Sequence, residues 1–463
     1  MMCVSSVQYA VLVNGEPCGK IIPSRGLRQG DLISPYLFLL CAEALSAIIS
    51  RANFDGELTG VPTSKRGPRL SHLFFADDSL LFCRTTIAQW VKLLHILLLY
   101  EEALGQQMNS NKTSILFNRN STNTDKENIM ALAGILASQS YETYLGLLAL
   151  VGRSRVAAFK HIIDRVWKRL KDWKLKFLSQ TGIEILLKVV VQAIPTYCMG
   201  VFLLPKSLCT EINSLMQNFW WGQQGNDRKI HWISWSKMGI PKSRGGMGFW
   251  DLACFNKALL AKQIWRMWKN PMSLVARIMK AKYHPNCSII EAARGRNPFF
   301  AWRSIQSSSD LIQEGLIWRV GNGEKIRIWQ DKWLPMPSTF KVYSTPILLH
   351  PTATVKELID STSKDWNREL IDNLFSVEEA RVIHSLPISR TDQADVQIWR
   401  RTPKGNFTAR SAYYMQKERE IESWVESSSR GDHQGIWKAV SKLGNLGTEK
   451  NFFWRACHDI LPT

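Results

Sequence analysis

Metal-binding cysteine pairs, a secretory signal and long apolar runs are all missing from this sequence, and each absence excludes a class of protein. The nine cysteines form no CxxC pair, which argues against a zinc ribbon or a disulfide framework. The start of the chain has no basic segment of the kind that opens a secretory signal. The longest apolar run, which begins at Pro35, contains Glu43 and is short of a membrane span. We therefore expect an intracellular protein, in the nucleus or cytoplasm, that is neither secreted nor bound to a membrane.

Acidic residues are too few to balance the basic ones. The 59 Lys and Arg residues outnumber the 39 Asp and Glu residues, which gives a net charge of +20. An excess of this size favours a polyanionic partner such as nucleic acid, although a soluble, self-repelling surface gives the same count. The hydrophobic content of 45% is enough for folded cores, and 463 residues exceed the usual length of one domain.

Tryptophan is almost absent from the first third of the chain. Of the 19 tryptophans, Trp90 alone precedes residue 151, and the others gather in clusters such as FWWGQQGNDRKIHWISW. A change of composition this sharp predicts a domain boundary near residue 150. A serine-rich and charged stretch at 417–435 predicts a later linker. Most of the tryptophans are expected in cores. Trp232 and Trp235, beside Lys229 and His231, are the candidates for stacking on bases.

The section before residue 150 mixes strand and helix signals. Residues 10–24 alternate around Asn14-Gly15, which predicts a β-hairpin. Ser34 is the expected N-cap of a helix whose first residue is Pro35. A second helix is expected to begin at Ile87 and end at Gly105.

The section after residue 150 is helical and basic. One apolar stripe is expected on Phe159, Ile162, Ile163, Val166, Trp167 and Leu170. Thr181 and Glu184 have the spacing of a capping box. Ten Lys and Arg residues lie between 151 and 190, against Asp164, Asp172 and Glu184. Two interpretations stay open, a surface that straddles a duplex backbone and a solvated helix face.

Two adjacent aspartates, Asp77 and Asp78, join two strand-like apolar runs in SHLFFADDSLLFC. A strand–turn–strand places them at a hairpin tip, with Phe75 and Leu81 as anchors. Turn chemistry alone explains many such aspartates. The functional interpretation is a site for Mg²⁺, which prefers carboxylate ligands together with substrate phosphates. A bound cation also relieves the repulsion between the two carboxylates.

An ordered series of motifs surrounds the aspartates: RGLRQGDLISPYLF before them, then NSNKTS and YLG after them. With the later FWWG, KIHWISW and WRVGNGEKIRIWQDKWLP, this series resembles reverse transcriptases of plant LINE-type (non-LTR) retrotransposons. The resemblance covers nearly the whole chain. It implies an RNA-directed DNA polymerase, a nucleotidyltransferase, that acts on an RNA template and a DNA primer or target.

The resemblance also implies roles for individual residues. Asp77 and Asp78 would be catalytic and would bind Mg²⁺ at a two-metal site. Gln29 and Gly30 would lie beside the template and the incoming nucleotide. Lys112 would approach the leaving pyrophosphate. Each has a simpler structural interpretation, a turn glycine for Gly30 and an exposed loop lysine for Lys112.

The resemblance further implies an α+β fold: a partial polymerase palm at 1–150, a helical basic thumb at 151–222, a Trp-rich and mostly helical connector at 223–416, and the start of a zinc-binding module at 436–463. The sequence departs from the family's pattern at several positions, and two of them bear on metal binding. Residues 1–30 contain no aspartate where the family has a further metal ligand, and Cys457 and His458 cannot hold zinc alone. We therefore expect an N-terminally truncated fragment that holds no zinc and is inactive by itself. The alternatives are a non-catalytic nucleic-acid-binding remnant and a product without a selected role.

Overall fold

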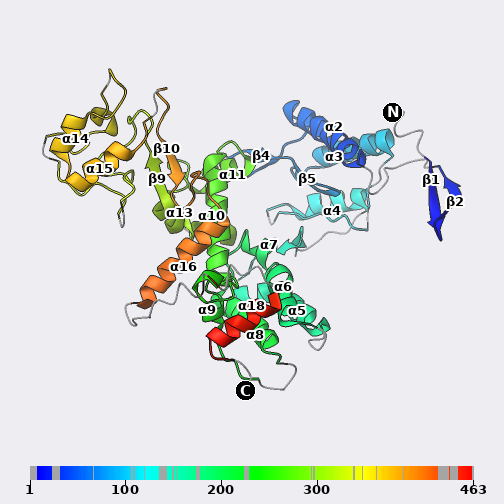
Figure 1. Ribbon diagram of the computed structural model, residues 1–463. Coiled ribbons are helices and arrows are strands. Elements are labelled where there is room, and N and C mark those ends of the chain that lie inside the picture. Colours follow the sequence, from blue (N-terminus) through cyan, green and yellow to red (C-terminus); the bar gives the residue numbers. More distant parts are fainter. Residues whose placement is uncertain are drawn as a thin grey trace. The chain divides into compact units, whose positions relative to one another are not determined.

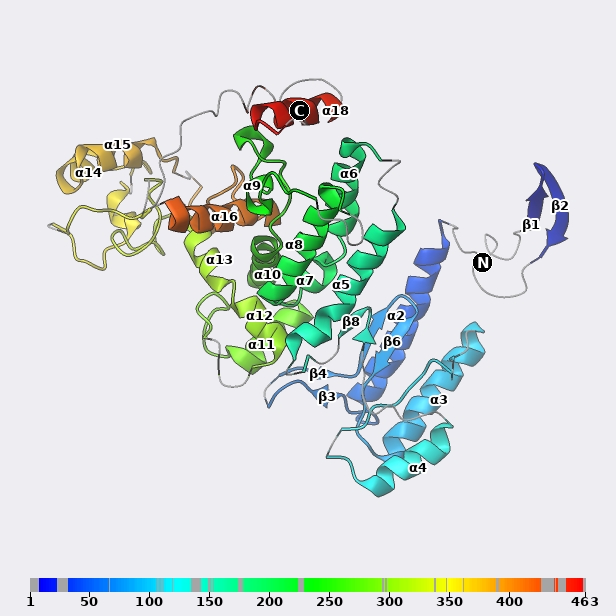
Figure 2. The same ribbon diagram turned by 90° about the horizontal axis from the view of Figure 1, so that it is seen from below.

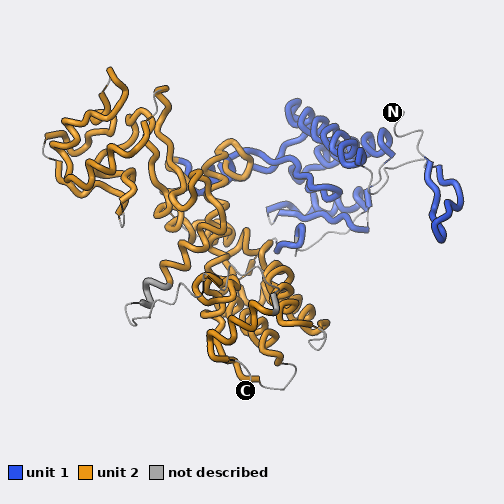
Figure 3. Tube along the Cα trace, in the orientation of Figure 1, with its two compact units in different colours: residues 1–150, 277–285 blue, residues 151–276, 286–463 orange. Residues whose placement is uncertain are grey.

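A computed structural model of the chain (Figure 1) describes residues 8–22, 32–65, 67–105, 108–109, 111–118, 120–134, 143–148, 151–152, 154–173, 178–223, 229–293, 295, 298–336, 339–346, 348–360, 362–388, 391–425, 437, 439 and 447–460. The chain divides into two compact units (Figure 3). Unit 1 comprises residues 1–150 and 277–285, and unit 2 comprises residues 151–276 and 286–463.

Both helices and strands are present, so the fold class is mixed α+β, as expected. The strands of the described residues form five separate two-stranded sheets, and all of these sheets are antiparallel.

Unit 1 is built around two helices, α2 (Ser34–Phe54) and α3 (Ile87–Leu104), which lie side by side in Figures 1 and 2. Its core contains Leu45, Ile49, Leu93 and Ile96 from these helices. The other elements of the unit are β1 (Tyr9–Val13), β2 (Glu16–Ile21), β3 (Val61–Pro62), β4 (Arg69–Leu70), β5 (His72–Phe75), β6 (Asp78–Leu81), α4 (Asn123–Ala133), β7 (Thr143–Tyr144) and β8 (Leu147–Leu148).

Three predicted element boundaries in unit 1 are tested by the structure. The turn of the β1–β2 hairpin is Asn14-Gly15, with φ of 53° and 90°, which confirms the prediction. Gly105 ends α3 in the left-handed conformation, as expected, and its N–H donates to the Glu101 carbonyl. Ser34 is instead the first residue of α2, and Ile33 is the N-cap, so this start lies one residue earlier than predicted.

The expectation about membranes needs a correction. The apolar run that begins at Pro35 belongs to a 21-residue helix, α2, which is long and apolar enough to cross a membrane by length and composition. A core helix passes the same test, and Leu45, Ile49 and Ala52 of α2 are buried inside unit 1. The expected absence of such a segment was wrong, and one helix of this kind is weak evidence for a membrane protein.

Unit 2 is mainly helical. Its first part contains α5 (Arg155–Asp172), α6 (Gln180–Leu186), the π-helix η2 (Leu187–Val191), α7 (Thr196–Met199), α8 (Lys206–Trp220), α9 (Trp235–Met238), η3 (Lys242–Arg244) and α10 (Leu252–Lys269). The chain then forms α11 (Leu274–Tyr283), which begins in unit 2 and continues into unit 1. The remaining elements of unit 2 are α12 (Phe300–Gln306), α13 (Ser309–Gly315), β9 (Leu316–Arg319), η4 (Val355–Leu358), α14 (Arg368–Leu374), α15 (Val377–Ser385), β10 (Val396–Trp399), α16 (Ala409–Val425) and α18 (Gly447–Cys457).

Helices α5 and α8 pack together and run in the same direction. Near their starts, the rings of Phe159 and Phe202 lie 5.6 Å apart, and near their ends those of Trp173 and Phe219 lie 6.0 Å apart. The buried stripe of α5 contains the predicted residues except Trp167, which is 52% exposed. The Lys171 ammonium lies 4.8 Å from the centre of the Trp167 ring, which compensates for the exposed indole by a cation–π contact.

The predicted capping box at Thr181 and Glu184 is wrong. Ser179 is the N-cap of α6 and accepts from the Gly182 N–H. Glu184 is buried and pairs with Lys188 and Lys242, each at 2.6 Å. Burial alone would raise the pKa of the Glu184 carboxyl, but the two ammonium groups outweigh it and lower that pKa. Glu184, which was expected to cap a helix, therefore joins α6 to η3.

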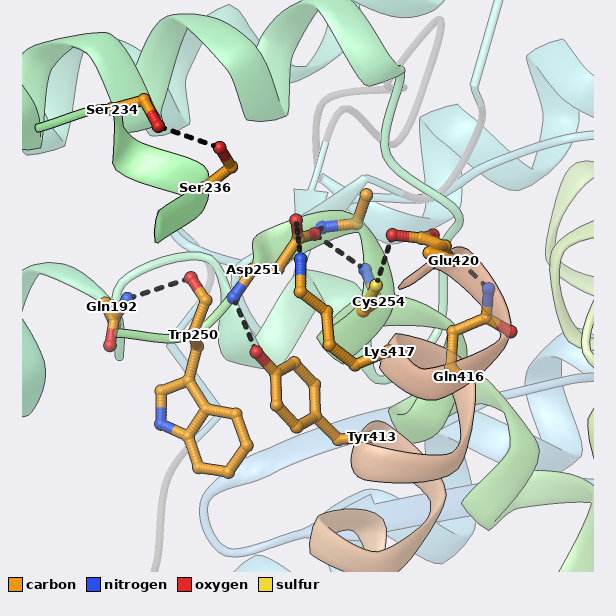
Figure 4. A network of polar contacts seen from close by, with 11 residues as sticks. Gln192, Ser234, Ser236, Trp250, Asp251, Cys254, Tyr413, Gln416, Lys417 and Glu420 are labelled. Carbon is orange, nitrogen blue, oxygen red and sulfur yellow. Dashed lines mark hydrogen bonds and ion pairs between the residues drawn. The ribbon is translucent and has the colours of Figure 1, made fainter. Parts of the chain in front are cut away.

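The linker expected at 417–435 starts too early, because residues 417–425 belong to α16. Lys417 and Glu420 tie α16 to the start of α10 (Figure 4). Asp251 caps α10 through Oδ1, which accepts from the N–H groups of Ala253 and Cys254, and its Oδ2 pairs with Lys417 at 3.2 Å. The Cys254 thiol donates to Glu420 at 3.0 Å.

Asp251, Cys254 and Glu420 lie close enough to share a metal ion. Burial and the neighbouring carboxylates, however, raise the pKa of the Cys254 thiol, which keeps it in the protonated form. The Lys417 ammonium, whose side chain is 13% exposed, already neutralises Asp251. We interpret this group as a clamp between helices rather than a metal site.

A separate core in unit 2 lies between β9 and β10 in sequence and includes Ile326, Trp333 and Ile383. The buried Asp395 carboxylate holds the loop that precedes this core. Its Oδ1 accepts from the N–H groups of Gly321 (2.7 Å) and Gly323 (2.9 Å), and its Oδ2 from that of Lys325 (2.8 Å). A side chain at Gly321 would collide with the Gln393 carbonyl, so this glycine is required.

Candidate active site and nucleic-acid interface

The aspartate hairpin forms as predicted, with one change at its tip. Strands β5 and β6 pair from His72↔Leu81 to Phe75↔Asp78. The turn is therefore Ala76-Asp77, and Asp78 is the first residue of β6. Ala76 has a φ of 48°, a left-handed conformation that costs a residue with a Cβ about 1–2 kcal/mol. Strain of this kind is concentrated at functional sites.

The pleat of the hairpin separates its two faces. Cross-strand partners share a face, so Phe74 and Leu81 lie on the face that packs against the α2–α3 core. Phe75 and its partner Asp78 lie on the other face. Phe75 is 61% exposed, so the expectation that it anchors the hairpin was wrong, whereas Leu81 does contact the core. The alternation of side chains thus turns Asp78 away from the apolar core.

His72 fixes the base of the hairpin to α2. Its Nε2 is 2.9 Å from the Ser46 hydroxyl, and its Nδ1 is 2.9 Å from the Ser71 hydroxyl. Burial lowers the pKa of His72, against the smaller opposing effect of Glu43. The sequence motifs do not indicate this contact; the one local signal for it is a histidine at the start of an apolar strand.

Both aspartates are exposed at the tip. Among the residues that the structure describes, no Lys, Arg or His forms an ion pair with either carboxylate, whereas Asp55 and Asp251 are paired with Arg51 and Lys417. Two adjacent, accessible carboxylates without a cationic partner fit the oxygen-rich ligand set of Mg²⁺.

The other predicted site residues are not brought to this hairpin. Gln29 and Gly30 lie outside the described residues. Lys112 is exposed in a turn in which its N–H donates to the carbonyl of Asn109 at 3.1 Å. Within the described part of the chain, no hydrogen bond or ion pair joins Lys112 to Asp77 or Asp78, so its role stays a prediction.

The YLG motif forms a second tight hairpin. Tyr144 ends β7, and the turn residues Leu145 and Gly146 have φ of 50° and 74°. A positive φ at both central residues is the signature of a type I′ turn. The motif thus has a defined backbone shape.

The polar face of α5 is strongly basic. Five exposed cations lie on this face: Lys160, Arg165, Lys168, Arg169 and Lys171. The acidic residues of α5 are Asp164 and Asp172. Arg155, which is also exposed, lies at the start of the apolar stripe, over the Phe300 ring. Lys188, which was counted with them, is instead enclosed by Glu184 and the Met247 carbonyl. A helix with an apolar stripe on one side and cations on the other can contact a phosphate backbone while it stays packed in its unit.

Comparison with known proteins identifies the first part of the chain. Residues 2–180 match the family described as reverse transcriptase (RNA-dependent DNA polymerase). This part of the chain belongs to the reverse transcriptase family. The aspartate hairpin and all of α5 lie within the matched region, and the family implies binding to a nucleic-acid template.

Three proteins of Arabidopsis thaliana are similar to parts of this chain. An uncharacterized mitochondrial protein is 41% identical over 150 residues, which cover 31% of this chain and 97% of that protein. A putative ribonuclease H protein is 29% identical over 314 residues, which cover 66% of this chain and 49% of that protein. A second uncharacterized mitochondrial protein is 50% identical over 82 residues, which cover 18% of this chain and 62% of that protein. The chain thus spans about half the length of the ribonuclease H relative.

Proposed function

We propose that this chain is the polymerase part of a non-LTR (LINE-type) retrotransposon reverse transcriptase of plant lineage, in which Asp77 and Asp78 bind catalytic Mg²⁺. The family match and the motif series support this proposal. The single observation that carries it is the β5–β6 hairpin, which presents on a strained turn two exposed carboxylates that pair with no cation of the described residues. The proposed place of action is intracellular, in the nucleus or cytoplasm.

The hairpin has the properties that metal-assisted phosphoryl transfer requires of a protein. When bound, a pair of Mg²⁺ ions activates the primer 3′-hydroxyl and stabilises the leaving oxygen. The strand pairing of Asp78 with Phe75 fixes its backbone, and the contact of His72 with Ser46 fixes the strand to α2. Such positioning matters because a misplacement of about 1 Å can reduce the rate on the order of a hundredfold.

In the proposed assignment, unit 1 corresponds to the palm, and α5 of unit 2 to the start of the thumb. The exposed cations of α5 would hold the backbone of the template–primer duplex by charge, without reading its sequence. The same surface also supports the alternative function, a nucleic-acid-binding remnant without chemistry.

Metal binding distinguishes the two functions. We expect Asp77→Asn and Asp78→Asn each to weaken Mn²⁺ binding at least about tenfold, because each removes one of two charged ligands. The measurement is free Mn²⁺ by electron paramagnetic resonance during titration of the full chain. Asp55→Asn is the matched control, because Asp55 is also exposed in unit 1 but is paired with Arg51.

Thermal melts of the same variants in metal-free buffer complete the test. Without a cation, the two carboxylates repel each other, so Asp78→Asn is expected to melt at the same temperature as the natural chain or slightly above it. A strongly destabilised Asp78→Asn would show that the pair is structural. Unchanged Mn²⁺ binding in both variants, with nucleic-acid binding intact, would favour the non-catalytic alternative.

A further inference from the structure

One exposed aromatic segment of unit 2 lies beyond the region that matches the reverse transcriptase family. Residues 229–232 have no regular secondary structure, and all of them are exposed. The Trp232 side chain is 59% exposed, whereas Ile233 is 7% exposed and Trp235 stacks on Phe249 with ring centres 4.7 Å apart. Trp235 therefore belongs to the packing, which leaves Trp232 as the candidate for stacking on bases. Trp232 stays accessible on an anchored segment.

The position of this segment within unit 2 follows from two contacts. The Gln217 side chain near the end of α8 donates to the Ile233 carbonyl at 3.5 Å. The ring contact of Trp173 with Phe219 brings the end of α5 to the same end of α8. Trp232 therefore lies at the carboxyl end of the α5–α8 pair.

The last turns of α5 add exposed cations and a second indole at this end. Lys168, Arg169 and Lys171 are exposed there, and Trp167 is 52% exposed beneath the Lys171 ammonium. Lys229 adds another cation beside Trp232. The acidic residue of these last turns is Asp172. An apolar protein partner would not need so many cations, so the charge favours a polyanion.

We propose that the carboxyl end of the α5–α8 pair binds single-stranded nucleic acid, with Trp232 stacking on a base and Lys168, Arg169, Lys171 and Lys229 facing phosphates. This rests on the proposed nucleic-acid-binding function and extends it to a second form of substrate. A single strand is the expected ligand because its bases expose the faces that a duplex hides, and an indole stacks on any of them. The site therefore has little sequence preference.

The test is fluorescence anisotropy of the full chain with a labelled single-stranded oligonucleotide and with a duplex of the same length. We expect Trp232→Ala to weaken single-strand binding by about 5- to 150-fold, which corresponds to the usual energy of one base–aromatic stack. Duplex binding should change less than about twofold. The dependence of single-strand affinity on salt should not change, because no charge is removed.

Two further variants separate stacking from a structural effect. Trp232→Phe retains a ring and should recover most of the lost affinity. Tyr343→Ala removes an aromatic side chain of similar exposure, 53%, from the β9–β10 region and should have no effect. Melting temperatures of the three variants should match that of the natural chain.

The outcomes show separately whether the stacking site fails and whether the proposed function fails. If Trp232→Ala binds the single strand normally while loss of the α5 cations weakens duplex binding, the stacking site is refuted and the proposed function stands. If Trp232→Phe is as weak as Trp232→Ala, stacking is also refuted. If loss of the α5 cations changes neither ligand, the proposed nucleic-acid interface itself fails.

Discussion

Replacing Arg165, Lys168 and Arg169 together by glutamine should weaken duplex binding by about two orders of magnitude at roughly 0.1 M salt. Each lysine or arginine that contacts a phosphate releases about 0.9 of a counterion, so its loss lowers both the affinity and the salt dependence. All three side chains are exposed on α5, and none is paired with an acid among the described residues. Glutamine keeps helix propensity, so the variant should fold normally.

The measurement is duplex binding at two or more salt concentrations. The slope of log K against log salt should fall by up to about 2.7, which is three contacts of about 0.9 each. The matched control is a second triple variant, Arg368→Gln, Arg381→Gln and Lys404→Gln. It removes the same amount of positive charge from exposed positions of the β9–β10 region and the loop after it. Equal losses in the two triple variants would mean that only net charge matters, and that α5 is an ordinary solvated helix face.

The second large effect is expected at Asp395. Asp395→Ala should destabilise the β9–β10 region by about 3–5 kcal/mol, because it leaves three backbone N–H groups without their charged acceptor. Asp395→Asn should also be strongly destabilising. An amide oxygen can replace Oδ1 toward Gly321 and Gly323, but the amide NH₂ would then face the Lys325 N–H, donor against donor.

Hydrogen exchange measured by mass spectrometry on the full chain reports this effect locally. Peptides from the core that includes Ile326 and Ile383 should exchange much faster in Asp395→Ala, while peptides of α5 should not change. Glu378→Ala is the control, because Glu378 is an exposed acid in the first turn of α15. Normal protection in Asp395→Ala would show that the loop does not depend on this carboxylate.

Local signals in the sequence predicted much of the fold. Asn14-Gly15 and Gly105 were predicted correctly because a positive φ is favoured by few residues, so glycine and asparagine mark such positions directly. The stripe of α5 was predicted for a similar reason, since a helix with one buried face must repeat its apolar residues. The exception, Trp167, is stabilised at the surface by Lys171, a contact that periodicity does not encode.

Tertiary contacts account for the predictions that failed. Thr181 and Glu184 had the spacing of a capping box, but Lys242, which is distant in the sequence, draws Glu184 into a buried ion pair. The 417–435 segment has the composition of a linker, yet Asp251 and Cys254 supply partners for Lys417 and Glu420. In each case the deciding partner lies more than fifty residues away, where local patterns carry no information.

At the candidate site, too, local sequence signals predicted the secondary structure, whereas contacts between distant residues were not predicted. The apolar runs on both sides of Asp77-Asp78 predicted the hairpin, but the exact turn depends on pairing register, which placed Ala76 rather than Asp78 in it. The loop held by Asp395 has the sequence GNGEK, which is part of one of the motifs that resemble the family. The structure shows that the N–H groups of its two glycines donate to the Asp395 carboxylate, a contact that the motif does not indicate.

The central claim is that a divalent cation binds at the tip of the β5–β6 hairpin. Fe²⁺ occupies carboxylate sites of Mg²⁺ type, and with ascorbate and peroxide it produces hydroxyl radicals that cut the backbone beside the bound ion. Mass spectrometry of the full chain after this treatment should locate cleavage around Asp77 and Asp78, with loss of the cut on addition of excess Mg²⁺ and in the double variant Asp77→Asn, Asp78→Asn. Cleavage that persists in the double variant, or that occurs only elsewhere in the chain, would contradict the proposed site.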